Sequence, residues 1–337
     1  MKKKENSFKT FVGIDISKKT LDICILTEGN NVAYLKETND KNGIKAIFTY
    51  LKVKKIELVS VLFCCENTGV YTMPLSLYLS EKQQSYWVAP AIEIKRSKGI
   101  SRGKSDKIDA KDIAFYAMTN LYKYKPYALP ERDLQELKVL FTEREKVIQC
   151  IKQLDTSSEN EGFYGKDILK IVLKINTSAV EGLKKSLAHI EKRMKEITSK
   201  NEVIKEQMSL ITSIPGIGQN TAWYLIVTTN GFKNFSEWRK LACYAGVAPF
   251  EYSSGTSVKG RTKVHSLADK KMKSLLHMCA LTTIKNNAEL KEYYTRKKEE
   301  GKPSMLVLNN VKCKLLSRVF AVVNRKQPFV NIFKYAA

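Results

Sequence analysis

Three short apolar segments follow one another near the start of the chain and predict a β-meander. They span residues 11–17, 21–26 and 32–35, and a Glu-Gly-Asn-Asn turn at 28–31 separates the last two. Their residue types have high strand propensity. The first segment contains one carboxylate, Asp15, and burying it in ionised form requires a cation or a hydrogen-bond donor. The pattern alone leaves open whether Asp15 belongs to a site or ends the strand and caps a turn.

The next segments alternate between helix and strand. Apolar spacing predicts a helix over 41–52, an unbroken apolar run predicts a strand over 56–66, Pro74 opens a second helix, and a further strand covers 85–88. A continuously apolar strand is covered on both faces, which indicates α/β layers. The order β-β-β-α-β-α-β-α is that of a ribonuclease-H-like domain. In open α/β sheets, functional groups gather near the carboxyl ends of strands.

Residues 94–112 combine seven bases with glycine and serine, which is typical of a loop that contacts a polyanion. The candidate nucleic-acid-binding residues there are Lys95, Arg96, Lys98, Arg102 and Lys104. Asp106 and Asp109 are three residues apart at the start of a predicted helix and share one face. Singly, they could be an N-cap and a solvated acid of the first turn. A strip that only bound phosphate would be better without them.

Four carboxylates from separate segments, Asp15, Glu66, Asp106 and Asp109, could hold two Mg²⁺ ions about 3.5–4 Å apart. Mg²⁺ prefers hard oxygen ligands and keeps waters where a substrate phosphate can enter. Asp112 lies on the same predicted helix and is an alternative to Asp109. The sequence therefore predicts a magnesium site that acts on phosphodiesters.

Beyond residue 127 the pattern is helical. An amphipathic helix covers 134–154, a polar loop covers 155–165, and apolar steps of four and three continue over 183–208. This spacing is typical of a coiled-coil seam, in which Asn201 would be a polar residue that sets the register. Its partner is either another protomer, which we favour, or the first helix of the same chain.

Residues 211–337 combine helices with two glycine-bearing loops. The sequence at 214–218 resembles a helix-hairpin-helix turn, in which Gly216 and Gly218 let backbone N–H groups approach a phosphate. A loop over 251–263 holds hydroxyls and glycines beside the bases Lys259, Arg261 and Lys263. Its serines either donate hydrogen bonds to phosphate or include a nucleophile on DNA phosphorus, and no general base is evident.

Charge and composition narrow the class of partner. The chain has 337 residues, enough for two or three domains, and a formal net charge of +24, which favours nucleic acid. No apolar segment approaches twenty residues and no signal peptide opens the chain, so we expect no membrane association. Seven scattered cysteines and three histidines give no zinc-site spacing and indicate reduced thiols in a cytoplasmic protein.

Three motifs together resemble the DEDD signature of insertion-sequence-110-type transposases, relatives of the Piv DNA invertase. They lie at 13–15, 66–71 and 105–110, and further likeness lies at 214–218, 245–249 and 254–260. The resemblance implies a RuvC-like α/β domain over 1–126, a helical coiled-coil spacer over 127–210, and a mostly helical C-terminal transposase domain over 211–337.

The resemblance also implies roles. Asp15, Glu66, Asp106 and Asp109 would be metal-binding catalytic acids, and the family's catalytic serine falls on Ser254, with Ser257 the alternative. The protein would act as a dimer or tetramer whose composite site joins two subunits, and a structured bridge RNA would select donor and target DNA. Two alternatives remain: a Holliday-junction-type metal endonuclease, which needs no serine, and a non-enzymatic nucleic-acid-binding protein.

Overall fold

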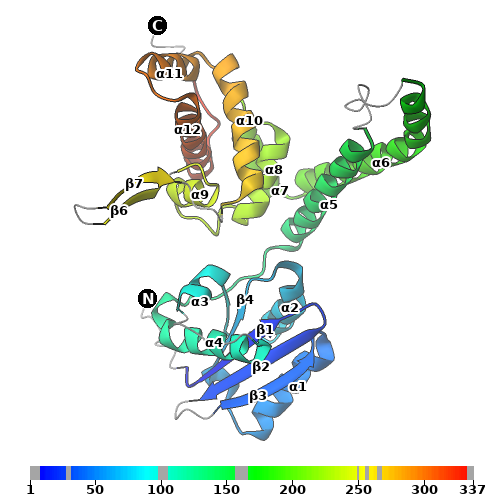
Figure 1. Cartoon of the computed structure of the whole chain (residues 1–337). Helices are drawn as coiled ribbons and strands as arrows, with labels where there is room; N and C mark the ends of the chain where they lie inside the picture. The colour runs from blue at the N-terminus through cyan, green and yellow to red at the C-terminus, as the bar shows by residue number, and fades with distance from the viewer. Residues whose placement is uncertain are drawn as a thin grey trace. The chain divides into compact units, whose positions relative to one another are not determined.

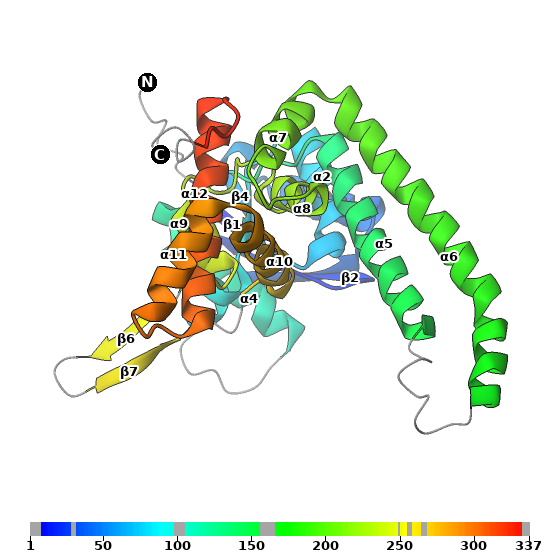
Figure 2. The same ribbon diagram turned by 90° about the horizontal axis from the view of Figure 1, so that it is seen from above.

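The structure is a computed structural model that describes residues 8–27, 32–97, 105–155, 166–248, 250–254, 258–263 and 268–331. For residues 250–254 and 258–263 only the backbone is described. The chain divides into two compact units, Met1–Leu129 and Pro130–Ala337. Figure 1 and Figure 2 show the elements of each unit from two directions.

The first unit is built on a five-stranded mixed sheet in the order β3-β2-β1-β4-β5. Strand β2 is antiparallel to β1 and β3, whereas β4 is parallel to β1 and β5. The elements are β1 (Thr10–Ile16), β2 (Thr20–Thr27), β3 (Val32–Thr38), α1 (Lys41–Val53), η1 (Leu58–Ser60), β4 (Val61–Glu66), η2 (Gly69–Thr72), α2 (Met73–Glu81), β5 (Tyr86–Ala89), α3 (Ala91–Ser97), α4 (Asp106–Thr119) and η3 (Leu121–Lys123). This order of helices and strands confirms the sequence prediction.

The two faces of the sheet receive alternate residues of each strand. Val12, Ile14 and Ile16 of β1 pack into a core that includes buried residues of α1 and α2. Phe11 belongs to the core on the other face, together with buried residues of α3 and α4. Helix α4 passes directly over β1. A Cβ added to Gly13 would lie only 2.2 Å from the backbone nitrogen of Ala114, which shows how closely the two backbones approach. Glycine at this position therefore permits the close helix–strand approach.

The strand predicted over 56–66 is shorter than expected. It begins at Val61, and residues Leu58–Ser60 form a 3₁₀ turn in which Val59 is 85% exposed. The partner strand explains the limit, since β1 begins at Thr10 and Thr10 pairs with Val61. Among the described residues, no strand lies beside the apolar residues before that point.

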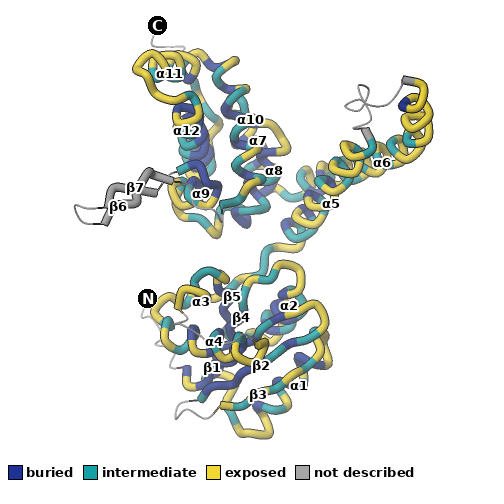
Figure 3. Tube along the Cα trace, in the orientation of Figure 1, coloured by how far each residue is buried: buried dark blue, intermediate teal, exposed yellow. Residues whose placement is uncertain are grey.

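The second unit is helical except for one hairpin. Its elements are α5 (Arg132–Asp155), α6 (Lys166–Lys200), α7 (Glu202–Thr212), α8 (Gln219–Thr229), α9 (Trp238–Tyr244), β6 (Phe250–Ser254), β7 (Val258–Lys263), α10 (Lys270–Asn286), α11 (Ala288–Glu299) and α12 (Ser304–Arg325). One core joins buried residues of α5 and α6 to those of α7 through α12. Figure 3 shows the buried side of α12 facing its neighbours, while much of α6 is exposed. The further division near residue 210 stays a prediction.

Helices α5 and α6 lie side by side and antiparallel (Figures 1 and 2). Arg193 of α6 donates to Glu136 of α5, and the Asn176 side chain donates to the carbonyl of Leu154. For this pairing the partner is thus the first helix of the same chain, not the protomer that we favoured. Association with a second protomer stays a prediction.

The prediction of a helix running unbroken through Asn201 is wrong. Helix α6 ends at Lys200 and α7 begins at Glu202. The Asn201 side chain accepts from the backbone N–H of Ile204 and donates to Asp133. Asparagine is a strong N-cap, so here it ends the seam and starts a new helix instead of setting a register.

Candidate active site

Charged residues line up across one end of the sheet, on the face that α4 covers. Asp15 of β1 pairs with Asp22 of β2, and Asp22 pairs with Lys36 of β3. Ile14 pairs with Cys65, so Asp15 and Glu66 come next in the same parallel register. Asp15 and Gly13 are two residues apart and share a face. We call Asp22, Asp15 and Glu66 the acidic row.

The apolar packing of this face stops where the acidic row begins. Cys24 and Cys64, which pair with Gly13, are buried among the apolar residues under α4. The next residues on the same face, two positions away from Cys24, Gly13 and Cys64 toward the same end of the sheet, are Asp22, Asp15 and Glu66. The row therefore lies at the carboxyl ends of β1 and β4, where open α/β sheets gather functional groups.

The turn after Glu66 is fastened beside the row. The Asn39 side chain donates to the backbone carbonyls of Ser17 and Tyr71, at 2.9 and 3.0 Å. These bonds connect the β1–β2 turn to η2, which directly follows the segment that carries Glu66. The backbone on both sides of the row is thus fixed by a single amide.

The first turn of α4 brings two more acids to this end of the sheet. Ser105 is the N-cap and accepts from the N–H of Ile108, so Asp106 is not the cap. Asp106 Oδ2 lies 4.0 Å from Lys36 Nζ, which belongs to the edge strand β3 next to the row. Asp106 and Asp109 both lie close enough to Asp15 to change its pKa.

The electrostatics of Asp15 show how crowded the site is. Burial is the largest cause of a raised pKa at Asp15, to about 6, and repulsion from four carboxylates adds to it. Those carboxylates are Asp109, Asp106, Glu66 and Asp22, in decreasing order of effect. The structure therefore brings the four predicted acids into one electrostatic neighbourhood.

The donor chemistry of this neighbourhood suits a hard divalent cation. Mg²⁺ prefers carboxylate oxygens, and a bound cation would relieve the repulsion that raises the pKa of Asp15. Within the described ranges, no three His, Cys, Asp or Glu side chains form a ready-made metal site. The set Asp15, Glu66, Asp106 and Asp109 as metal ligands stays a prediction.

Two residues of this end were not predicted, Asp22 and Lys36. The signal for Asp22 was present in the turn, because Ser17 N donates to Thr20 O and closes it around Lys18-Lys19. That closure fixes the register in which Asp15 faces Asp22. To predict that Lys36 lies beside Asp22, the register of β3 against β2 would have been needed as well.

The predicted basic residues of this unit are only partly described. Lys95 and Arg96 lie in the last turn of α3 and are exposed. The Tyr116 hydroxyl donates to Glu93 at 2.7 Å, which fastens α3 to α4. Lys98, Arg102 and Lys104 lie outside the described residues.

In the second unit, the surroundings of Gly216 and Gly218, the two glycines predicted to contact phosphate, differ. Gly216 has φ +94°, and a Cβ there would lie 1.9 Å from the Thr283 hydroxyl, so the fold itself requires glycine. Gly218 has φ −92°, and an added Cβ would meet no atom within 4 Å. Gly218 is the N-cap of α8, which has no side-chain cap. Steric packing does not require glycine at position 218, and its contact with a phosphate stays a prediction.

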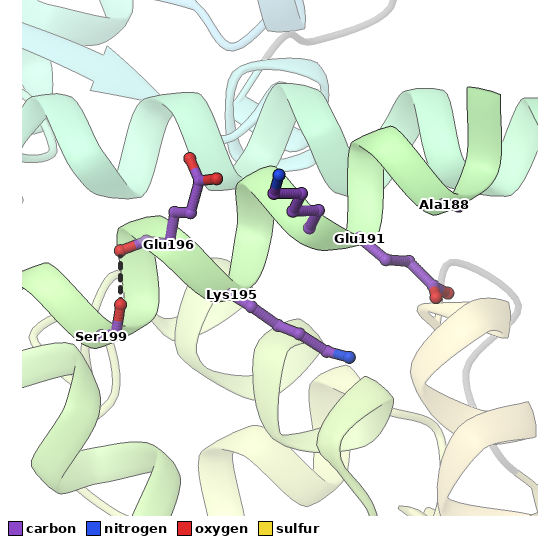
Figure 4. Close-up of a pocket in the computed structure, with 6 residues that line it drawn as sticks. Ala188, Glu191, Lys195, Glu196 and Ser199 are labelled. Carbon is purple, nitrogen blue, oxygen red and sulfur yellow. Dashed lines mark hydrogen bonds between the residues drawn. The ribbon is translucent and has the colours of Figure 1, made fainter. Parts of the chain in front are cut away.

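A cavity of about 540 Å³ lies in front of this turn, between α6, α8 and α10. It is lined by Glu191, Lys195, Gly216, Gly218, Gln219, Asn220, Thr221, Trp223, Leu275, Met278, Cys279 and Thr282. Figure 4 shows a second pocket, of about 510 Å³, along α6, where Glu191 and Lys195 also lie. Each pocket is lined by equal numbers of acids and bases, so charge does not distinguish them. The cavity at the glycine turn is the better phosphate candidate because the N-terminus of α8 lines it.

The predicted serine loop at 251–263 is largely a β-hairpin. Strands β6 and β7 are antiparallel, and Ser254 ends β6 and pairs with Val258. Lys259, Arg261 and Lys263 lie in β7, and Ser257 lies outside the described residues. The loop prediction was wrong because backbone pairing outweighs the turn propensity of glycine and serine here.

The helices give no sign of a membrane-spanning segment, since no helix within the described ranges is both long and apolar enough.

Two family models match the chain, and together they cover more than two thirds of it. A transposase model of the IS110 DEDD type matches residues 12–159, and the model of the transposase IS116/IS110/IS902 family matches residues 208–295. The first match contains all four predicted acids, and the second contains the glycine turn and the serine hairpin.

Named relatives agree with these matches. The pilin gene-inverting protein of Moraxella lacunata is 24% identical over 326 residues, which cover 95% of this chain and 98% of that protein. The transposase for insertion sequence element IS1533 of Leptospira borgpetersenii is 25% identical over 256 residues, which cover 68% of this chain and 72% of that protein.

Proposed function

Since the chain belongs to the IS110-type family of DNA transposases and is therefore an enzyme that acts on DNA, we propose that it is a site-specific recombinase whose catalytic acids are Asp15, Glu66, Asp106 and Asp109. The observation that carries this proposal is the convergence of these acids on Asp15, where burial and then repulsion from the other carboxylates raise the pKa to about 6. Perturbed acids at the carboxyl ends of strands are typical of active sites.

We assign the metal to the same four acids. Mg²⁺ bound there would polarise a phosphodiester oxygen and stabilise charge on the departing one. The acids would orient the ion, and the half-buried position of Asp15 on the sheet would limit the access of water from that side. Asn39 keeps the turn after Glu66 in place while the substrate binds.

Ser254 is the nucleophile in this proposal. Its hydroxyl oxygen loses a proton and forms a bond to a DNA phosphorus, the bond from that phosphorus to one deoxyribose oxygen breaks, and the leaving oxygen takes up a proton, so no net proton is gained or lost. A hydroxyl of the exchanged strand then reverses the step and restores the diester without an external energy source. Ser254 is the last residue of β6, where its backbone pairs with Val258 of β7.

The partners follow from charge and family. A net charge of +24 supports binding of DNA and of a structured guide RNA, and the serine of one subunit would meet the acids of another in a dimer or tetramer. The basic residues at 95–104 and in β7, together with the glycine turn, would contact phosphates.

The proposal is tested by incubating the full-length protein with labelled DNA that carries the element ends, with and without co-purified RNA. We expect a covalent protein–DNA adduct on denaturing gels that Asp15→Ala and Ser254→Ala each abolish and the matched variant Ser257→Ala keeps. An adduct that survives in Ser254→Ala would remove the serine assignment. Metal-dependent cleavage without any adduct would favour the junction endonuclease, and binding that Glu66→Gln leaves unchanged, with no cleavage, would favour a non-enzymatic protein.

The glycine turn has its own matched pair of variants. Gly218→Ala should weaken binding of a generic DNA duplex about threefold to tenfold, because a methyl group would hold phosphate away from the N–H groups of α8. Gly216→Ala should instead lower the thermal midpoint, since Thr283 leaves no room for a Cβ. Equal DNA affinity of Gly218→Ala and the wild type, measured by fluorescence anisotropy, would contradict the assignment.

A further inference from the structure

One cation lies at the outer end of the acidic row. Lys36 Nζ is 3.3 Å from Asp22 Oδ1 and 4.0 Å from Asp106 Oδ2. The first contact is cross-strand, because Lys36 and Asp22 pair directly in the β2–β3 register. The second contact reaches the first turn of α4. Lys36 therefore connects the sheet to the helix that carries two of the proposed catalytic acids.

The two ion pairs differ in how well they are shielded. The Lys36 side chain is 60% exposed, the Asp22 side chain 13% and the Asp106 side chain 64%. Exposed pairs at long distance are weak and easily exchanged, and pairs with one shielded partner are less screened by salt. The shorter pair with Asp22 is thus the more durable of the two, and the contact with Asp106 can be given up at low cost.

A neighbouring contact fastens the same helical turn to β3. Lys107 Nζ lies 4.1 Å from the centre of the Tyr34 ring. Tyr34 and Lys36 are two residues apart on β3 and share one face of the strand. With Tyr34 holding Lys107, the first turn of α4 stays over the sheet when Lys36 releases Asp106.

We propose that Lys36 is a positioning residue that serves as a resident counter-cation of the acidic site, holding Asp22 and the start of α4 and competing with the divalent ion for Asp106. The inference rests on the proposed function, in which Asp15, Glu66, Asp106 and Asp109 hold Mg²⁺. Before the ion binds, the ammonium offsets part of the carboxylate repulsion. When the ion binds, Lys36 keeps Asp22, and Asp106 turns to the ion.

The test measures Mg²⁺ binding by calorimetry and thermal unfolding without metal, neither of which requires activity. Lys36→Gln should bind Mg²⁺ about threefold to tenfold more tightly, because one positive charge near a divalent ion is removed. Its metal-free midpoint should fall, since Asp22 then lies unpaired beside Asp15. Lys36→Arg should behave like the wild type in both measurements.

Lys45→Gln is the matched control, because Lys45 is exposed on α1, which packs on the opposite face of the sheet. It changes the net charge equally and should leave Mg²⁺ affinity unchanged. Lys36→Met repeats the measurement with a side chain that keeps the aliphatic stem.

Three results would overturn the inference. If Lys36→Gln and Lys36→Met bind Mg²⁺ as the wild type does, or more weakly, the lysine does not compete with the ion. If Lys45→Gln tightens binding as much as Lys36→Gln, the effect is one of net charge alone. If the wild type and Asp15→Asn both fail to bind Mg²⁺, the metal assignment of the proposed function fails, and the inference falls with it.

Discussion

The two faces of the five-stranded sheet differ in how far their apolar packing extends along the strands. On the face covered by α1 and α2, β1 is apolar to its last residue, and Ile14 and Ile16 are both buried. On the face covered by α4, the apolar contacts end at Gly13 and Asp15 follows. Consecutive residues of one strand therefore have different tasks. Ile14 stabilises the fold, and Asp15 is the residue that we propose takes part in the chemistry.

The difference between the two faces also explains why residue 13 is a glycine. Because Gly13 has no side chain, α4 lies against the backbone of β1 and brings Asp106 and Asp109 toward Asp15. On the face covered by α4, the missing side chain at position 13 thus reduces side-chain packing but allows the acids to approach one another closely. The following variants separate the two tasks, from the largest expected effect to the smallest.

The largest effect is expected on the acidic face. Glu66→Gln keeps the side-chain shape but removes a charge, and it should lower the recombination rate by about 10³-fold or more. The thermal midpoint of the metal-free protein should not fall, because repulsion of Asp15 is reduced. A rate within tenfold of the wild type would mean that Glu66 is not part of the reacting site.

On the other face, truncation should reduce stability and leave the chemistry intact. Ile14→Ala removes a side chain with 0% exposure and should lower the free energy of unfolding by about 2–5 kcal/mol. Denaturant titration measures the loss, and a recombination assay well below the new midpoint measures the activity per folded molecule. If the activity fell as far as in Glu66→Gln, the separation of the two faces would be wrong.

Gly13→Ala should affect both tasks. The new methyl group would meet the backbone of Ala114 and Ala110, so α4 must shift, and the free energy of unfolding should fall by about 1–3 kcal/mol. Mg²⁺ affinity should fall as well, because the acids of α4 move away from the row. Calorimetry that shows wild-type affinity would contradict the role assigned to this glycine.

The smallest effect is a pH dependence of the metal-free protein. The pKa of Asp15 is about 6 when folded and near its ordinary value of 3.8 when unfolded, so between these values the folded state binds a proton that the unfolded state does not. Stability should therefore rise as the pH falls from 7 toward 4, by about 1 kcal/mol after allowance for solvent screening of this half-buried group. The rise should be absent in Asp15→Asn, and a rise of equal size there would assign it to another group.

The sequence was informative wherever a local pattern determined the structure. Short apolar segments and the turn at 28–31 predicted the β-meander, and Asp15 and Glu66 were found because one lies within an apolar run and the other ends one. Residues 56–60 and Asn201 were misread, because the partner strand and the helix cap decide their conformation, not their own composition. Lys36 was missed because its role depends on a cross-strand register and on a helix seventy residues later.

The most direct test of the account is to locate the divalent ion itself. Crystals of the full-length protein soaked in Mn²⁺ should give anomalous density beside Asp15, with ligands from Glu66 and from the first turn of α4. Density at that position in the wild type, and its loss in Asp15→Asn, is the expected result. Manganese bound only elsewhere, or no manganese beside Asp15 in a well-ordered crystal, would contradict the claim that these separate acids form one metal-binding active site.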